Sequence, residues 1–131
     1  MFDHNDIIYI SGPMSGIPDA NRAAFNAAEK YLADEFGCKV LNPARHEDGL
    51  NYAQYMELAM LDVSCCTKVV TLPGVQSSMG ACFEIFVAGL KLHKPVYSLF
   101  EVQPGQSAIK NRIFSLPDLN SPEMGLYYRK E

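Results

Sequence analysis

The sequence predicts a three-layer α/β fold, with a parallel sheet of four to five strands and helices on both faces. Its 131 residues suit a single domain that can bury a core. Along the chain, the spacing of apolar residues switches repeatedly between the strand period and the helix period, and the joints between segments are short. Strands that alternate with helices over short connections pair in parallel and carry helices on both sides.

Four apolar segments predict the strands, and three amphipathic segments predict the helices between them. The strands are expected at residues 7–10, 39–41, 68–72 and 95–99. The helices are expected at residues 18–36, 52–66 and from about 78 onward. We assign residues 1–100 to one domain and residues 101–131 to a C-terminal extension packed on it. Within that extension, residues 109–114 are expected to form a short helix and residues 117–122 an irregular tail.

The charge pattern favours a small-molecule ligand. The net charge is −4 and the Lys and Arg residues form no basic stripe, which argues against binding to duplex nucleic acid. The first residues lack the features of a signal peptide, and no apolar run approaches membrane-spanning length, so we expect a cytoplasmic protein without a membrane partner. The cysteines have no C-x-x-C spacing and the histidines (His4, His46 and His93) form no ligand pattern, so neither a metal site nor a cofactor is expected.

One carboxylate lies in an unusual context. Glu84 is the single charged side chain between Val69 and Leu90. A buried carboxylate is costly unless it is paired, hydrogen-bonded or chemically active. Gly80 and Ala88 lie one helical turn to either side, and such small neighbours leave room for a ligand. Glu84 is therefore expected to face the crevice at the carboxyl ends of the strands, with a solvent-facing or ion-paired acid as the alternative.

Two segments offer backbone N–H groups to an anion. The loop after the first strand contains Gly12 and Gly16, but it matches neither G-x-G-x-x-G nor a Walker A motif, which argues against a dinucleotide or NTP site. At the start of the third helix, Ser78 and Gly80 form a second candidate cradle. A simple Ser78 N-cap is the competing interpretation.

Taken together, these segments resemble the nucleoside 2-deoxyribosyltransferase-like superfamily. The similarity spans about residues 7 to 99 and consists mainly of Tyr-Ile-Ser-Gly-Pro-Met at 9–14, Ser-Met-Gly-Ala-Cys-Phe-Glu at 78–84 and Lys-Pro-Val at 94–96. Further segments look most like a branch common in phages and prophages: residues 21–25, 42–44, 55–56 and 72–74. The spacing of Ser78 and Gly80 before Glu84 is similar to that of the deoxynucleoside 5′-monophosphate N-hydrolases.

The resemblance implies a flavodoxin-like or Rossmann-like sheet and an enzyme that cleaves or transfers the N-glycosidic bond of a deoxynucleoside or its 5′-monophosphate. Glu84 would be the nucleophile, and Tyr9 would orient its carboxylate. The substrate would be held by residues of the two motifs: Gly12, Pro13, Met14, Ser78 and Gly80. Members are commonly homodimers or larger homo-oligomers, which the resemblance implies here as well.

The chain departs from the family pattern at the assisting acids. The family's helix-two Asp falls on Ala59, and a further Asp falls on Thr67. Asp62 lies one turn beyond Ala59 on the same helix face, so we assign it as the candidate acid/base.

The phosphate site also differs from the pattern. A Ser at position 78 admits a phosphate where an Asp would repel it, which favours a monophosphate substrate. Yet Ser15 stands where the monophosphate hydrolases place a phosphate-binding Arg, which leaves Arg22 or Arg45 as replacements.

Two other interpretations stay open. Loss of an assisting acid costs about 10²–10⁴ in rate, so the chain is alternatively a non-catalytic nucleotide-binding module that serves as a sensor, sponge or partner-binding protein. The third interpretation is a structural oligomer with an empty crevice. Apolar residues of the tail would then mediate subunit contact or cover a site: Met124, Leu126, Tyr127 and Tyr128.

Overall fold

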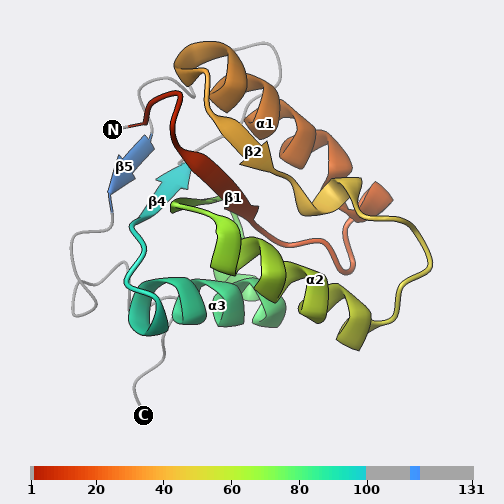
Figure 1. Ribbon diagram of the computed structural model, residues 1–131. Coiled ribbons are helices and arrows are strands. Elements are labelled where there is room, and N and C mark those ends of the chain that lie inside the picture. The colour runs from red at the N-terminus through yellow and green to blue at the C-terminus, as the bar shows by residue number, and fades with distance from the viewer. Residues whose placement is uncertain (1, 100–112, 116–131) are drawn as a thin grey trace.

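The computed structural model describes residues 2–99 and 113–115, and it contains one five-stranded sheet (Figure 1). The strand order is β2-β1-β3-β4-β5, in which the first four strands are parallel and β5 is antiparallel to β4. The strands are β1 (Ile7–Ser11), β2 (Lys39–Leu41), β3 (Lys68–Thr71), β4 (Val96–Leu99) and β5 (Ile113–Ser115). The predicted α/β fold with a parallel sheet is confirmed.

Helices cover both faces of this sheet. Helix α1 (Arg22–Phe36) packs on one face, and helices α2 (Tyr52–Cys65) and α3 (Met79–Phe86) lie together on the other (Figure 1). Helix α3 continues into a π-helical turn, η4 (Val87–Lys91). Three short 3₁₀ turns complete the connections: η1 (Pro18–Asn21), η2 (Pro43–Arg45) and η3 (Val75–Ser77). Among the described residues, no helix combines the length and apolarity needed to cross a membrane.

Residues of β1 alternate between two hydrophobic cores, one on each side of the sheet. Ile8 and Ile10 join the core that contains Phe25 and Leu32 of α1. Tyr9 joins the second core, which α2 and α3 cover. Because successive side chains of a strand point to opposite faces, Ser11 lies on the same face as Tyr9. The face that carries α2 and α3 therefore receives two hydroxyl groups from β1.

The start of α1 differs from the prediction. We expected the helix to begin at Pro18, but Asp19, Ala20 and Asn21 have φ values of 51°, 53° and 60°, in the left-handed region. The Asn21 side-chain amide donates a hydrogen bond of 3.0 Å to the carbonyl of Pro13, which ties this turn to the loop after β1. Regular helix therefore begins only at Arg22.

The predicted helix at residues 109–114 is wrong in its described part. Residues 113–115 form β5, whose Ile113 pairs with Leu99 of β4. A segment of β-branched and aromatic residues suits a sheet edge, and its pairing supplies hydrogen-bond partners for the outer side of β4. The irregular tail expected at 117–122 and the apolar tail residues from Met124 to Tyr128 lie outside the described residues.

Candidate active site

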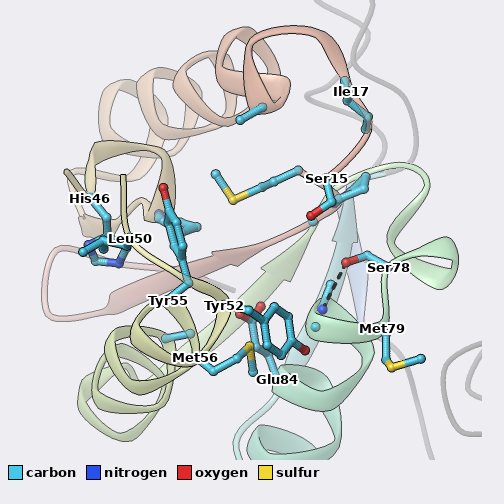
Figure 2. Close-up of a pocket in the computed structure, with 18 of the residues that line it drawn as sticks. Ser15, Ile17, His46, Leu50, Tyr52, Tyr55, Met56, Ser78, Met79 and Glu84 are labelled. Atoms are coloured by element: carbon cyan, nitrogen blue, oxygen red, sulfur yellow. Dashed lines mark hydrogen bonds between the residues drawn. The ribbon is translucent and has the colours of Figure 1, made fainter. Parts of the chain in front are cut away.

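A pocket of about 570 Å³ opens at the carboxyl ends of the parallel strands (Figure 2). Its walls are formed by the loops that follow β1, β2 and β3 and by the first turns of α2 and α3. The lining is largely apolar, with Met and Tyr side chains from the α2 side. Such a pocket is the usual place for a small-molecule ligand in an α/β fold.

Glu84 lies in this pocket and is held by two hydroxyl groups of β1. Ser11 Oγ donates to Glu84 Oε1 at 2.7 Å, and the Tyr9 hydroxyl donates to Oε2 at 3.0 Å. Both donors are fully buried. Tyr9 and Ser11 alternate with core isoleucines on β1, so the strand itself presents both donors to α3.

Burial governs the protonation of Glu84. Desolvation raises the pKa of its carboxyl to about 7, and the hydrogen bonds from Ser11 and Tyr9 offset only part of this effect. The negative charge of Asp62 raises the pKa further. Burial beside Glu84 also raises the pKa of Tyr9 well above its ordinary value, so its hydroxyl stays a donor at neutral pH. Glu84 is thus a weakly solvated carboxylate that ionises near neutrality and has fixed donors on both oxygens.

The loop after β1 reaches the pocket through a close backbone approach. A Cβ at Gly12 would lie 2.9 Å from two atoms of the Leu72 side chain, so only glycine fits there. Pro13, Met14 and Ser15 continue the wall from this point. The Gly12 position therefore has a packing role that does not depend on any ligand.

The start of α3 forms the opposite wall. The Ser78 hydroxyl accepts a hydrogen bond of 3.2 Å from the backbone N–H of Ala81, which is a helix N-cap. Ser78 and Gly80 both line the pocket. A Cβ at Gly80 would lie 3.6 Å from the Met56 sulfur, so this glycine sits where α3 and α2 meet. The cap engages the oxygen of Ser78 as an acceptor and leaves its O–H able to donate to a ligand.

The acid predicted on α2 occupies a different place from the pocket wall. Ala59 lines the pocket, whereas Asp62 is not among the described lining residues. Asp62 Oδ2 lies 3.2 Å from Nε2 of His46, and His46 does line the pocket. Burial raises the pKa of Asp62, and His46 offsets part of that effect. Asp62 is thus connected to the pocket only indirectly, by its contact with His46.

The comparison with protein families supports one assignment. A family model described as "Domain of unknown function (DUF4406)" matches residues 6–97. The chain belongs to the DUF4406 family. The matched segment contains all the sequence-predicted site residues, from Tyr9 to Glu84, and so the whole described pocket lies within the family domain. No protein of curated function matches the chain.

The sequence analysis missed Ser11, which donates a hydrogen bond to Glu84, and His46, which lines the pocket of this DUF4406 domain. Ser11 had a signal, because it follows Tyr9 by two residues and therefore shares its face of β1. His46 had none, since it lies in a polar loop whose path no periodicity predicts, and it belongs to no ligand motif. Within the described residues, no group of three or more His, Cys, Asp or Glu side chains is placed to hold a metal ion.

The cations considered for phosphate binding are engaged elsewhere. Arg22 donates to the carbonyl of Ala44 and pairs with Asp19 and Asp48. The Nε and Nη2 atoms of Arg45 donate hydrogen bonds to the two carboxylate oxygens of Glu29, at 2.6 and 2.7 Å. Neither arginine lines the pocket, and the lining residues within the described part of the chain include no Lys or Arg.

Thr67, the second departure from the family pattern, lies before β3 at the other end of the sheet. Its hydroxyl donates to Asp6 at 2.8 Å and accepts from the N–H of Ile7 at 3.0 Å. These contacts join the starts of β1 and β3 and give Thr67 a role in the fold.

Proposed function

We propose that this protein cleaves the N-glycosidic bond of a 2′-deoxynucleoside or its 5′-monophosphate, with Glu84 as the nucleophile. The observation that carries the proposal is the Glu84 carboxylate, which lies buried in a pocket and is hydrogen-bonded by Tyr9 and Ser11. The nucleoside deoxyribosyltransferase-like character of DUF4406 supports it. A buried carboxylate without a cationic partner is difficult to explain as a stabilising group.

The proposed reaction proceeds in two steps with retention at the anomeric carbon. A Glu84 oxygen attacks C1′ of the sugar, the C1′–N bond breaks, and the base leaves with the bonding electrons. A covalent glycosyl-enzyme remains. Water then attacks C1′ and releases Glu84, or a second base takes the place of water and the reaction is a transfer. Tyr9 and Ser11 fix the carboxylate so that its free lone pairs point at the sugar.

The shape and polarity of the pocket suit the parts of a nucleoside. Tyr52, Tyr55 and Met56 offer an apolar wall of the kind on which a base stacks. Gly80, one helical turn before Glu84, has no side chain and leaves space there for the sugar. The lack of Lys and Arg among the described lining residues favours an uncharged nucleoside over a monophosphate, because a phosphate would have only hydroxyl groups, backbone N–H groups and the His46 imidazole as donors there.

The test is base release. We would incubate the protein with each common 2′-deoxynucleoside and its 5′-monophosphate, with and without a second free base, and separate the products by chromatography. Glu84→Gln is the decisive variant, and Glu57→Gln, an exposed acid on α2 away from the pocket, is the matched control. Release or exchange that persists in Glu57→Gln and is lost in Glu84→Gln supports the proposal. Equal activity in both variants contradicts it.

A second candidate is a nucleotide-binding module without catalysis. Ala59 favours it, because this small apolar side chain occupies the pocket wall where the family pattern has an assisting Asp. A binder would be stabilised thermally by one nucleoside or nucleotide and would release no base from it. The same set of incubations, with a melting curve for each compound, separates the two candidates.

A further inference from the structure

His46 is an ionisable side chain in the pocket that the proposed reaction has not used. It lies in the loop between η2 and α2, with 19% of its side chain exposed. Figure 2 shows its ring on the side of the pocket near Leu50, well apart from Glu84. A group on one side of a bound sugar and a nucleophile on another is the arrangement that an in-line displacement at C1′ requires.

The Asp62 carboxylate lies beside one nitrogen of this imidazole. Its Oδ2 lies 3.2 Å from the buried Nε2 of His46, which is close enough for an ion pair when the ring is protonated, although Nε2 has no hydrogen-bond partner of good geometry within the described residues. Nδ1 is then the nitrogen available to a ligand, and it makes no hydrogen bond or ion pair to the residues that the structure describes. Other ionisable groups that act electrostatically on Asp62 or feel its charge include Glu84, Tyr9 and Cys66. An imidazole oriented by a carboxylate is a common arrangement for proton transfer.

The chemistry needs such a group. A nucleobase leaves poorly as an anion, and a positioned general acid accelerates such a step by about 10²–10⁴. Ala59 cannot supply a proton, and Asp62 does not reach the pocket wall. Histidine is the side-chain type best suited to give and take a proton near neutral pH.

We propose that His46, positioned by Asp62, protonates the leaving base and then deprotonates the attacking water. This inference rests on the proposed function. In the first step, Glu84 forms the C1′–O bond, the C1′–N bond breaks, and the imidazolium transfers its Nδ1 proton to the base. In the second step, neutral His46 takes a proton from water as the oxygen attacks C1′, the bond to Glu84 breaks, and the imidazolium is restored.

Paired substrates distinguish this role from a structural one. For a purine, the pair is 2′-deoxyguanosine and 7-methyl-2′-deoxyguanosine, whose base is already cationic and leaves without taking up a proton. If the wild type accepts only pyrimidines, the pair is 2′-deoxyuridine and 5-nitro-2′-deoxyuridine, whose base leaves as a stabilised anion. Single-turnover rates of base release, corrected for the spontaneous reaction, are measured for His46→Gln, Asp62→Asn and Glu84→Gln. His4→Gln, at an exposed position outside the pocket, is the control.

We expect His46→Gln to slow release from the ordinary nucleoside by about 10²-fold or more and to slow release from the activated one by less than about threefold. Asp62→Asn should show the same difference between the two substrates with a smaller loss of rate. Glu84→Gln should release the base from neither substrate. Equal losses on both substrates in His46→Gln, or no loss on either, would overturn the role of His46 while leaving Glu84 in place. A wild type that releases no base from any substrate would instead overturn the proposed function.

Discussion

Two carboxylates lie at opposite ends of the same parallel strands, and their surroundings differ. Asp6, just before β1, accepts hydrogen bonds from Lys68 Nζ at 2.8 Å, from the Thr67 hydroxyl at 2.8 Å and from the N–H of Asp3 at 3.0 Å. Burial alone would raise the pKa of Asp6, but the hydrogen bonds from Lys68, Thr67 and the Asp3 backbone, together with the positive charge of Lys68, outweigh it and the pKa is lowered. Asp6 is an ionised group whose charge is compensated.

Glu84, at the carboxyl ends of the strands, has two hydroxyl donors and, within the part of the chain that the structure describes, no comparable cation. Its pKa moves in the opposite direction, to about 7, because burial dominates. The same fold therefore lowers the pKa of one carboxyl and raises that of the other, and under the proposed function this difference separates a structural carboxylate from a reactive one. The fold satisfies the charge at the amino ends of the strands and leaves it unsatisfied where the pocket opens.

The largest expected difference between the two acids is in catalysis. Glu84→Gln should lower the rate of base release by about 10³-fold or more, because an amide cannot form the glycosyl-enzyme. Asp6→Asn, measured at a temperature where it remains folded, should stay within about twofold of the wild type. Similar losses in the two variants would mean that Glu84 acts through the fold.

The second largest difference between Glu84 and Asp6 should be in how each acid makes the free energy of unfolding depend on pH. The carboxyl of Glu84 ionises near pH 7 in the folded protein and at about 4.5 when unperturbed, so the folded state binds its proton more tightly. The free energy of unfolding should therefore fall by about 3 kcal/mol as the pH rises from about 4.5 to about 7. Glu84→Gln should lack this decline, so that it exceeds the wild type in stability at pH 8. Denaturant unfolding at pH 5 and pH 8 checks this, and parallel pH profiles for both proteins would contradict it.

Asp6 should show the reverse behaviour. Its lowered pKa contributes stability that is present above about pH 4 and is lost as the pH falls through the folded pKa. Asp6→Asn should lose about 2 kcal/mol at neutral pH, because the charged contact between Asp6 and Lys68 is lost in a mostly buried setting. Urea unfolding at pH 7 measures the loss. An Asp6→Asn variant with the stability of the wild type would show that the Asp6–Lys68 pair contributes nothing to stability.

The smallest effects concern the hydroxyls beside Glu84. Ser11→Ala removes the 2.7 Å donor to Oε1 and should slow base release about tenfold. Thr71 is the register partner of Ser11 on β3 and shares its face of the sheet, but its buried hydroxyl has no hydrogen-bond partner within the described residues. Thr71→Val should therefore leave the rate unchanged and the stability equal or slightly higher. A larger loss of rate in Thr71→Val than in Ser11→Ala would contradict the assignment of the donors.

The sequence carried enough information for the sheet and for the position of Glu84. The alternation of Ile8, Tyr9 and Ile10 gives the facing of β1, and the small residues around Glu84 mark the ligand side of α3. These signals are local, because they depend on strand and helix periods alone. The long-range pairing of Ser11 with Glu84 required the register of β1 against α3, which no local pattern contains.

The remaining differences have similar causes. The positive φ values before Arg22 follow from a contact between Asn21 and Pro13, which are eight residues apart. Asp62 was predicted to point to the same place as Ala59, but only Ala59 is among the described lining residues, and Asp62 contacts His46 of the preceding loop instead. Strand β5 forms because the outer side of β4 accepts it, and the helical pattern around Ile113 gave no sign of that partner.

The most direct test of Glu84 as a nucleophile is to trap the covalent intermediate. A 2′-fluoro-2′-deoxyarabinosyl analogue of the best substrate slows both steps, because fluorine destabilises the oxocarbenium-like transition states. Intact-protein mass spectrometry should show one added fluoro-sugar without its base, and peptide mapping should place it on Glu84. An adduct on another residue, or an adduct of equal yield in Glu84→Gln, would contradict the account.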